Sequence, residues 1–149
     1  MTQDKTLGTL NHLIAICRDG EEFYNMAADK VADPGLQGLF REMAEVRRRI
    51  GDDLRPEVSR AGGSPSEGGT LAGTVRRVYA NLRASLSSDT HEVLLAELVE
   101  LEEKALAAFE QAQSEPMTPE GRALVAEKVR TIRETHDRMR RVKSETVGA

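Results

Sequence analysis

The sequence has 149 residues, of which 39% are hydrophobic, 3% aromatic and 31% charged, with a formal net charge of −4. This length suffices for one domain with its own core. The few aromatic residues disfavour a β sandwich or barrel, the acidic balance argues against a general nucleic-acid binder, and the single cysteine excludes an intrachain disulfide and a cysteine-rich zinc site.

The abundance of Ala, Leu, Glu and Arg favours helices, and the first two are predicted in the N-terminal part of the chain. Apolar residues recur with helical spacing over residues 5–31 and again over residues 34–60. Asp33-Pro34 between them is typical of an N-cap followed by a proline in the first turn. The two helices should therefore form an antiparallel hairpin, followed by a glycine-rich loop over residues 61–69.

Three further helices are predicted after that loop. The first is short, over residues 71–86, and longer ones follow over residues 90–113 and 119–144. Thr118-Pro119 repeats the N-cap and proline signal, so the last two helices form a second hairpin.

The predicted fold class is all-α, with one domain over residues 1–149. Two antiparallel hairpins joined by a long crossover, which carries the short extra helix, have the connectivity of a ferritin-like four-helix bundle. The alternative is an up-down-up-down bundle with the extra helix packed outside.

Function in a bundle core is indicated by polar residues that fall on the apolar stripe of a helix. At 100° per residue, one such residue lies on each long helix: Glu21, Arg47, Glu102 and His136. Because a buried charge is costly unless it is paired or coordinated, we expect these side chains to meet in one buried polar layer.

Two interpretations of this layer remain open. In one, Glu21, Glu102 and His136 ligate a metal such as iron or manganese, since carboxylate and imidazole suit such ions. However, di-iron bundles use Glu-x-x-His motifs, and Arg133 stands where the glutamate before His136 would be. In the other interpretation, Arg47 and His136 neutralise the two glutamates without a cofactor, which we take as the main reading.

With these residues in view, the chain resembles a bacterial ferritin-like family of unknown function. The segments that carry the resemblance are LNHLIAICRDGEEFY, which has an LNxLIxxCRDGEExF-type pattern, then GGSPSEGGTLAGTVRRVYANL, ELEEKALAAFEQA and THDRMR. The resemblance implies a ferritin-like four-helix bundle in the cytoplasm, sometimes linked to stress responses, and matches Glu21, Arg47, Glu102 and His136 to family positions. It implies no established reaction.

The expected protein is therefore non-enzymatic and acts through self-association or a protein partner. A homodimer or other homo-oligomer is expected, with the wide apolar arc of helix 90–113 or the outside of helix 71–86 as its surface. No secretory signal or membrane span is predicted, and Cys17 is expected to be a buried structural thiol. The alternative function is a metal-dependent oxidoreductase of ferritin or rubrerythrin type, or an iron-binding protein; a stress-induced DNA-associated protein is a third hypothesis.

Overall fold

Four helices form a bundle in the part of the chain that the structure, a computed structural model, describes, which is residues 2–65 and 90–147. They are α1 (Thr2–Lys30), α2 (Pro34–Arg60), α4 (Thr90–Ala112) and α5 (Pro119–Val147). The described ranges contain no strand, so the prediction of an all-α helical bundle is confirmed for them. The predicted helix 71–86 lies outside the described residues.

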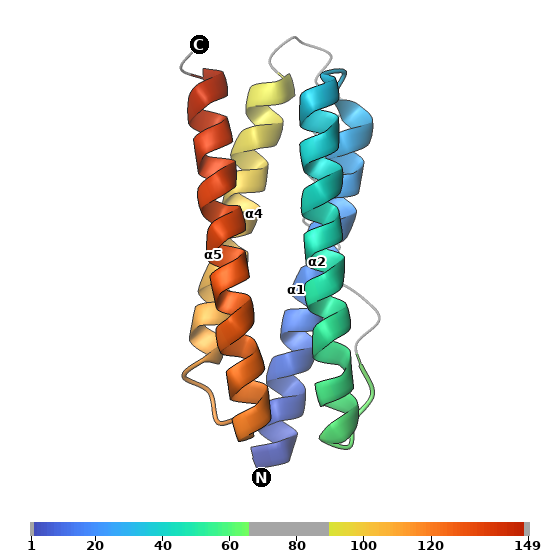
Figure 1. Cartoon of the computed structure of the whole chain (residues 1–149), viewed down its shortest axis with the longest axis vertical. Helices are drawn as coiled ribbons and strands as arrows, with labels where there is room; N and C mark the ends of the chain where they lie inside the picture. Colours follow the sequence, from blue (N-terminus) through green and yellow to red (C-terminus); the bar gives the residue numbers. More distant parts are fainter. Residues whose placement is uncertain (1, 66–89, 148–149) are drawn as a thin grey trace.

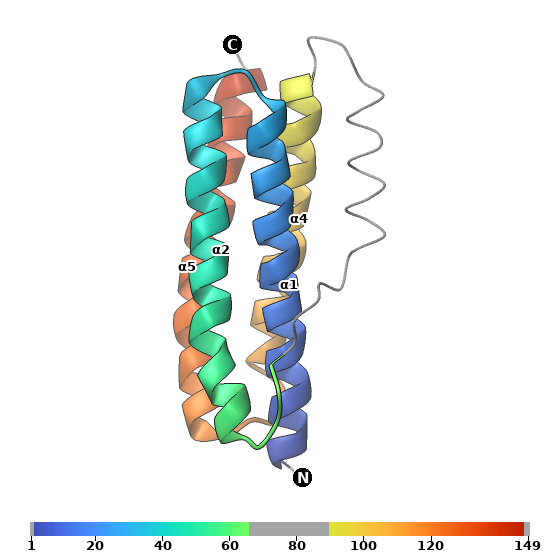
Figure 2. The same cartoon turned by 90° about the vertical axis from the view of Figure 1, so that its right-hand side faces the viewer.

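The helices run along the long axis of the molecule, and α2 and α4 point in the same direction (Figure 1). α1 packs against α2 and α4, whereas α5 packs against α4 and α2. Figure 2 shows the α1–α2 hairpin beside the α4–α5 hairpin. This direction pattern needs one long crossover between the hairpins and differs from the up-down-up-down alternative.

Both predicted N-caps are present where the proline signals place them. The Asp33 side chain accepts a hydrogen bond from the backbone N–H of Leu36 at 3.0 Å, and Pro34 is the first residue of α2. At α5, Thr118 Oγ1 accepts from the N–H of Gly121 at 3.2 Å. These caps satisfy backbone donors that the first turn of a helix leaves without partners, and they fix where each hairpin turns.

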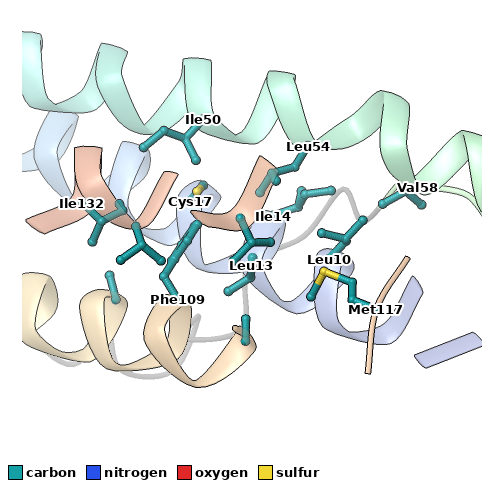
Figure 3. Close-up of a cluster of buried hydrophobic side chains, with 14 residues drawn as sticks. Leu10, Leu13, Ile14, Cys17, Ile50, Leu54, Val58, Phe109, Met117 and Ile132 are labelled. Atoms are coloured by element: carbon teal, nitrogen blue, oxygen red, sulfur yellow. The ribbon is translucent and has the colours of Figure 1, made fainter. Parts of the chain in front are cut away.

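Two apolar clusters fill the bundle, one above the other along its axis. The upper cluster contains Phe23, Tyr24, Ala27, Ala28, Val31, Phe40, Met43, Ala44, Leu94, Leu95, Leu98, Val99 and Met139. The lower cluster, most of which is labelled in Figure 3, contains Leu10, Leu13, Ile14, Cys17, Ile50, Leu54, Val58, Ala105, Phe109, Ala112, Met117, Val125, Val129 and Ile132. On α2 the upper cluster ends at Ala44 and the lower cluster begins at Ile50. On α4 the upper cluster ends at Val99 and the lower cluster begins at Ala105.

The wide apolar arc of α4 is used inside the bundle. Leu94, Leu95 and Leu98 are fully buried in the upper cluster, and Ala105 and Phe109 in the lower one. This arc was one of the two surfaces expected to form a homodimer, and these members of it pack the core of the bundle, whereas Leu101 and Leu106 are half-buried. Among the described large hydrophobic side chains, Val93 of α4 is exposed, at 41%.

None of the helices within the described residues is long and apolar enough to span a bilayer. This agrees with the sequence, which carries charged residues along every one of them.

Candidate functional site: a buried ion pair between two apolar clusters

A polar layer separates the upper cluster from the lower one. Arg47 of α2 and Glu102 of α4 lie midway between the last residue of one cluster and the first of the next on their helices, and they are 1% and 0% exposed. The nitrogen Nη2 of Arg47 lies 3.1 Å from Oε2 of Glu102. The structure therefore brings together these two of the four predicted residues as a buried ion pair.

Two hydroxyl groups complete the surroundings of the Glu102 carboxylate. The Tyr24 hydroxyl of α1 donates to Oε1 at 2.5 Å, and Oγ1 of Thr135 on α5 lies 3.0 Å from Oε2. Thr135 Oγ1 also lies 2.9 Å from the Ile132 carbonyl oxygen, so its single proton can be donated to either acceptor. One carboxylate is thus contacted by side chains from the three other described helices.

Electrostatics keep Arg47 and Tyr24 in defined protonation states. Burial favours neutral Arg47, but its acidic neighbours, Glu102 foremost, together outweigh burial and raise the pKa of the guanidinium, which stays charged. Burial, with the Glu102 carboxylate beside it, raises the pKa of Tyr24 well above its usual value. Tyr24 therefore remains a neutral hydrogen-bond donor.

Gly20 makes room for the arginine. A Cβ atom at this position of α1 would lie 2.9 Å from Nη1 of Arg47 and 3.1 Å from its Cγ, which is closer than real contacts of this kind. A glycine inside a helix costs about 1 kcal/mol relative to alanine. Its presence in the middle of α1 is explained by the guanidinium packed against it.

The guanidinium is only partly satisfied. It has five N–H donors, and none of its three nitrogens makes a hydrogen bond of good length and direction with the described residues, although Nη2 is close to Oε2. Arg47 and Glu102 are thus close enough to form an ion pair, but the N–H groups of Arg47 do not point along a hydrogen bond to the carboxylate. Buried donors without acceptors are costly, so this arrangement calls for an explanation.

Glu21 does not join the layer. Its side chain is 19% exposed and lies 3.4 Å from Arg18 on its own helix. On α1 the inward positions at this level belong to Gly20 and Tyr24, which contact Arg47 and Glu102 respectively. Glu21 is on the same side of the helix but turned toward α2, where it lines a surface cavity.

His136 lies at the edge of the layer rather than in it. Its residue is 9% exposed, and its Nδ1 lies 3.1 Å from Oδ1 of Asp137, its neighbour in the chain. The contact with Glu102 is made instead by Thr135, one residue earlier. The helical phase therefore located the correct turn of α5 but not the correct side chain.

The structure does not bring the expected ligand set Glu21, Glu102 and His136 together. Residues 2–65 and 90–147 contain no cluster of three or more His, Cys, Asp or Glu side chains that could hold a metal. Glu42, on the polar side of α2, pairs with Arg138 of α5 at 2.9 and 3.1 Å, and this hydrogen-bonded pair lowers the pKa of Glu42. The side chains that contact Glu102 are a positively charged guanidinium and two hydroxyl groups. This set does not fit a metal ion, which would need further carboxylate or imidazole ligands.

Sequence reasoning missed Tyr24 and Thr135 as members of the layer. Tyr24 lies on the apolar face of its helix and is fully buried, and a buried hydroxyl needs a partner, which is the signal that the sequence offered. Thr135 offered a weaker signal, because a threonine can satisfy its hydroxyl within its own helix, as the contact with Ile132 illustrates.

Comparison with known proteins identifies a family of unknown function. A family model described as a domain of unknown function (DUF2383) matches residues 5–115, which include Tyr24, Arg47 and Glu102 but not Thr135. No curated protein matches the chain.

The ion pair predicts a strong coupling between Arg47 and Glu102. Arg47→Met or Glu102→Gln alone leaves one buried charge without its partner, and each should lower the free energy of unfolding by about 3–5 kcal/mol. The double variant should lose less than the sum of the two by at least about 1 kcal/mol. Urea denaturation of the four proteins measures this coupling.

The exposed pair between Arg41 and Asp29 provides the control for this cycle, because its two side chains are 57% and 68% exposed. Arg41→Met should change the free energy of unfolding by less than about 1 kcal/mol. Additive effects of Arg47→Met and Glu102→Gln would contradict a direct interaction between the two side chains.

Cys17 should make the stability fall in alkaline solution. Burial raises the pKa of its thiol from 9.0 to about 12, with Arg47 opposing part of the shift. The folded state then holds a proton that the unfolded state releases, so this contribution is complete below pH 9 and is lost as the pH rises toward 12. Denaturation at several pH values should show a shallower decline for Cys17→Ala than for the unsubstituted protein. Equal slopes would show that the thiol is not protected in the folded state.

Proposed function

Because the chain belongs to the DUF2383 family, a family of domains of unknown function, we propose its function from the geometry of its core. It is a non-enzymatic, ferritin-like bundle in which a buried ion pair takes the place of a metal centre. It acts by binding, either to further copies of itself or to another protein. A cytoplasmic location and a role in stress belong to the same proposal and rest on the resemblance of its motifs to ferritin-like proteins.

The observation that carries this proposal is the complete engagement of Glu102. Its two carboxylate oxygens are contacted by Arg47, Tyr24 and Thr135 at distances of 2.5 to 3.1 Å. In di-iron bundles the inward glutamates bind metal together with Glu-x-x-His motifs from the other helices. A guanidinium within 3.1 Å of the carboxylate repels a divalent cation at this position.

The ferritin-like assignment is supported by the direction of the helices. α2 and α4 run in the same direction, as one long crossover between two hairpins requires (Figure 1). The polar layer also lies midway along the bundle, at the level where side chains from all four described helices converge.

Self-association has a candidate surface near the start of α1. A groove of about 260 Å³ lies between the start of α1 and the end of α4, lined among others by Gly8, Leu13, Ala108 and Ala112. Small and apolar residues at such a groove allow a side chain of a second copy to approach the backbone closely. We propose this groove as the contact, ahead of the arc of α4, most of which packs inside the bundle.

Metal analysis tests the non-enzymatic reading, including the alternative of an iron- or manganese-dependent oxidoreductase. Protein purified without a histidine tag from medium containing iron, manganese and zinc should hold far less than one metal ion per chain. Glu102→Gln should leave that content unchanged, as should Glu103→Gln, whose side chain is exposed on the same helix. Stoichiometric iron or manganese that is lost in Glu102→Gln and in Glu21→Ala, but not in Glu103→Gln, would overturn the proposal.

Light scattering after gel filtration tests self-association. The mass should exceed that of the 16.4 kDa chain at high protein concentration. A Cβ at Gly8 or at Gly38 would meet no atom within 4 Å, so a side chain at either position begins in open space. Gly8→Arg should lower the mass because it obstructs the groove, whereas Gly38→Arg, on α2, should not. A mass of one chain for the unsubstituted protein would remove self-association and leave a different partner.

A further inference from the structure

A second cavity lies on the face shared by α1 and α2, directly outside the polar layer. Its volume is about 170 Å³, and Arg47 forms part of its lining together with Cys17 and Gly51. Pockets for drug-sized ligands occupy about 300–1,000 Å³, so this one suits a ligand of only a few heavy atoms.

The charge of this cavity favours an anion. Four arginines line it, namely Arg18, Arg47, Arg48 and Arg55, against the two carboxylates of Glu21 and Asp52. The three outer arginines are 37–49% exposed and form ion pairs with neighbours on their own helices. Exposed pairs of this kind contribute little stability, so an arginine can exchange its partner for a ligand at small cost.

The hydrogen-bonding state of Arg47 also favours an anion in this cavity. Its side chain is 1% exposed, it lines this cavity, and none of its three nitrogens has a well-directed hydrogen bond within the described residues. Glu102 on its inner side is shared with Tyr24 and Thr135. An acceptor in the cavity would therefore pair with donors that the described part of the protein leaves without one. The nitrogens are enclosed, so this contact requires the guanidinium to turn slightly toward the cavity.

We propose that this cavity binds a small oxyanion, a carboxylate or a phosphate group, held by Arg48 and Arg55 at the mouth and by Arg47 beneath. The planar guanidinium fork matches both groups with paired N–H donors. Arg47 then links the site to the core, because the same guanidinium faces Glu102 on one side and the anion on the other. The inference goes beyond the proposed function, since it requires neither self-association nor the absence of a metal.

Gly51 provides a variant that tests the cavity without damaging the fold. A Cβ at this position would lie 3.5 Å from Cβ of Cys17, an ordinary van der Waals contact. Gly51→Ala therefore places a methyl group in the cavity lining and should preserve or raise the stability of α2, because alanine favours a helix more than glycine does.

The experiment is a calorimetric titration of the full chain with inorganic phosphate and, separately, with acetate, at constant ionic strength set by chloride. One saturable site per chain is expected for at least one anion, and the anion that binds identifies the chemistry. Gly51→Ala and Arg48→Gln should each weaken binding by about tenfold or more. Arg49→Gln is the matched control: Arg49 neighbours Arg48 but is 67% exposed and does not line the cavity, so its loss should leave binding unchanged.

NMR of the arginine side chains gives a second readout that does not depend on a destabilising Arg47 variant. The Nε–H signal of Arg47 should shift as the anion saturates the site. Absence of saturable binding, equal binding by Gly51→Ala and the unsubstituted protein, or equal weakening by Arg48→Gln and Arg49→Gln would each overturn the inference. None of these outcomes bears on the metal content, so this inference and the proposed function can fail separately.

Discussion

The fold is organised around the burial of two opposite charges at the centre of an otherwise apolar bundle. Removing a guanidinium and a carboxylate from water costs several kcal/mol for each, and their attraction compensates only when both occupy the right positions. Arg47 on α2 and Glu102 on α4 belong to different hairpins, which only the folded bundle brings together. The pair lies between the two apolar clusters and therefore favours one register of the hairpins against each other.

Other residues of the bundle are adapted to this pair. Gly20 gives up a side chain because the guanidinium occupies its space, while Tyr24 and Thr135 direct hydroxyl groups to the two oxygens of Glu102. A layer built in this way has little capacity for a metal, because its acceptor is already engaged by a cation. What it retains is spare donor capacity on Arg47, which also lines the cavity between α1 and α2. On the proposal made above, this spare donor capacity serves the recognition of an anion.

Local signals in the sequence account for much of the architecture. The proline signals after Asp33 and Thr118 predict the starts of α2 and α5, and both side chains form the expected caps. The helical period separates apolar from polar faces well enough to identify Arg47 and Glu102 as inward charges, because each is surrounded on its own helix by large apolar residues. A residue's angular position is a property of one helix, so one-dimensional periodicity is sufficient to find it.

The sequence by itself thus determined the four described helices, their pairing into hairpins and the presence of charge inside the core. Only the tertiary structure decided which side chains meet. Glu21 shares a helix face with Tyr24, yet it turns toward Arg18 while Tyr24 reaches Glu102, and Thr135 makes the contact expected of His136. Contact between helices depends on their separation and register and on side-chain rotamers, and a difference of one residue changes the direction of a side chain by about 100°. Periodicity carries none of these quantities, so the composition of the polar layer and the cavity beside it became visible only in three dimensions.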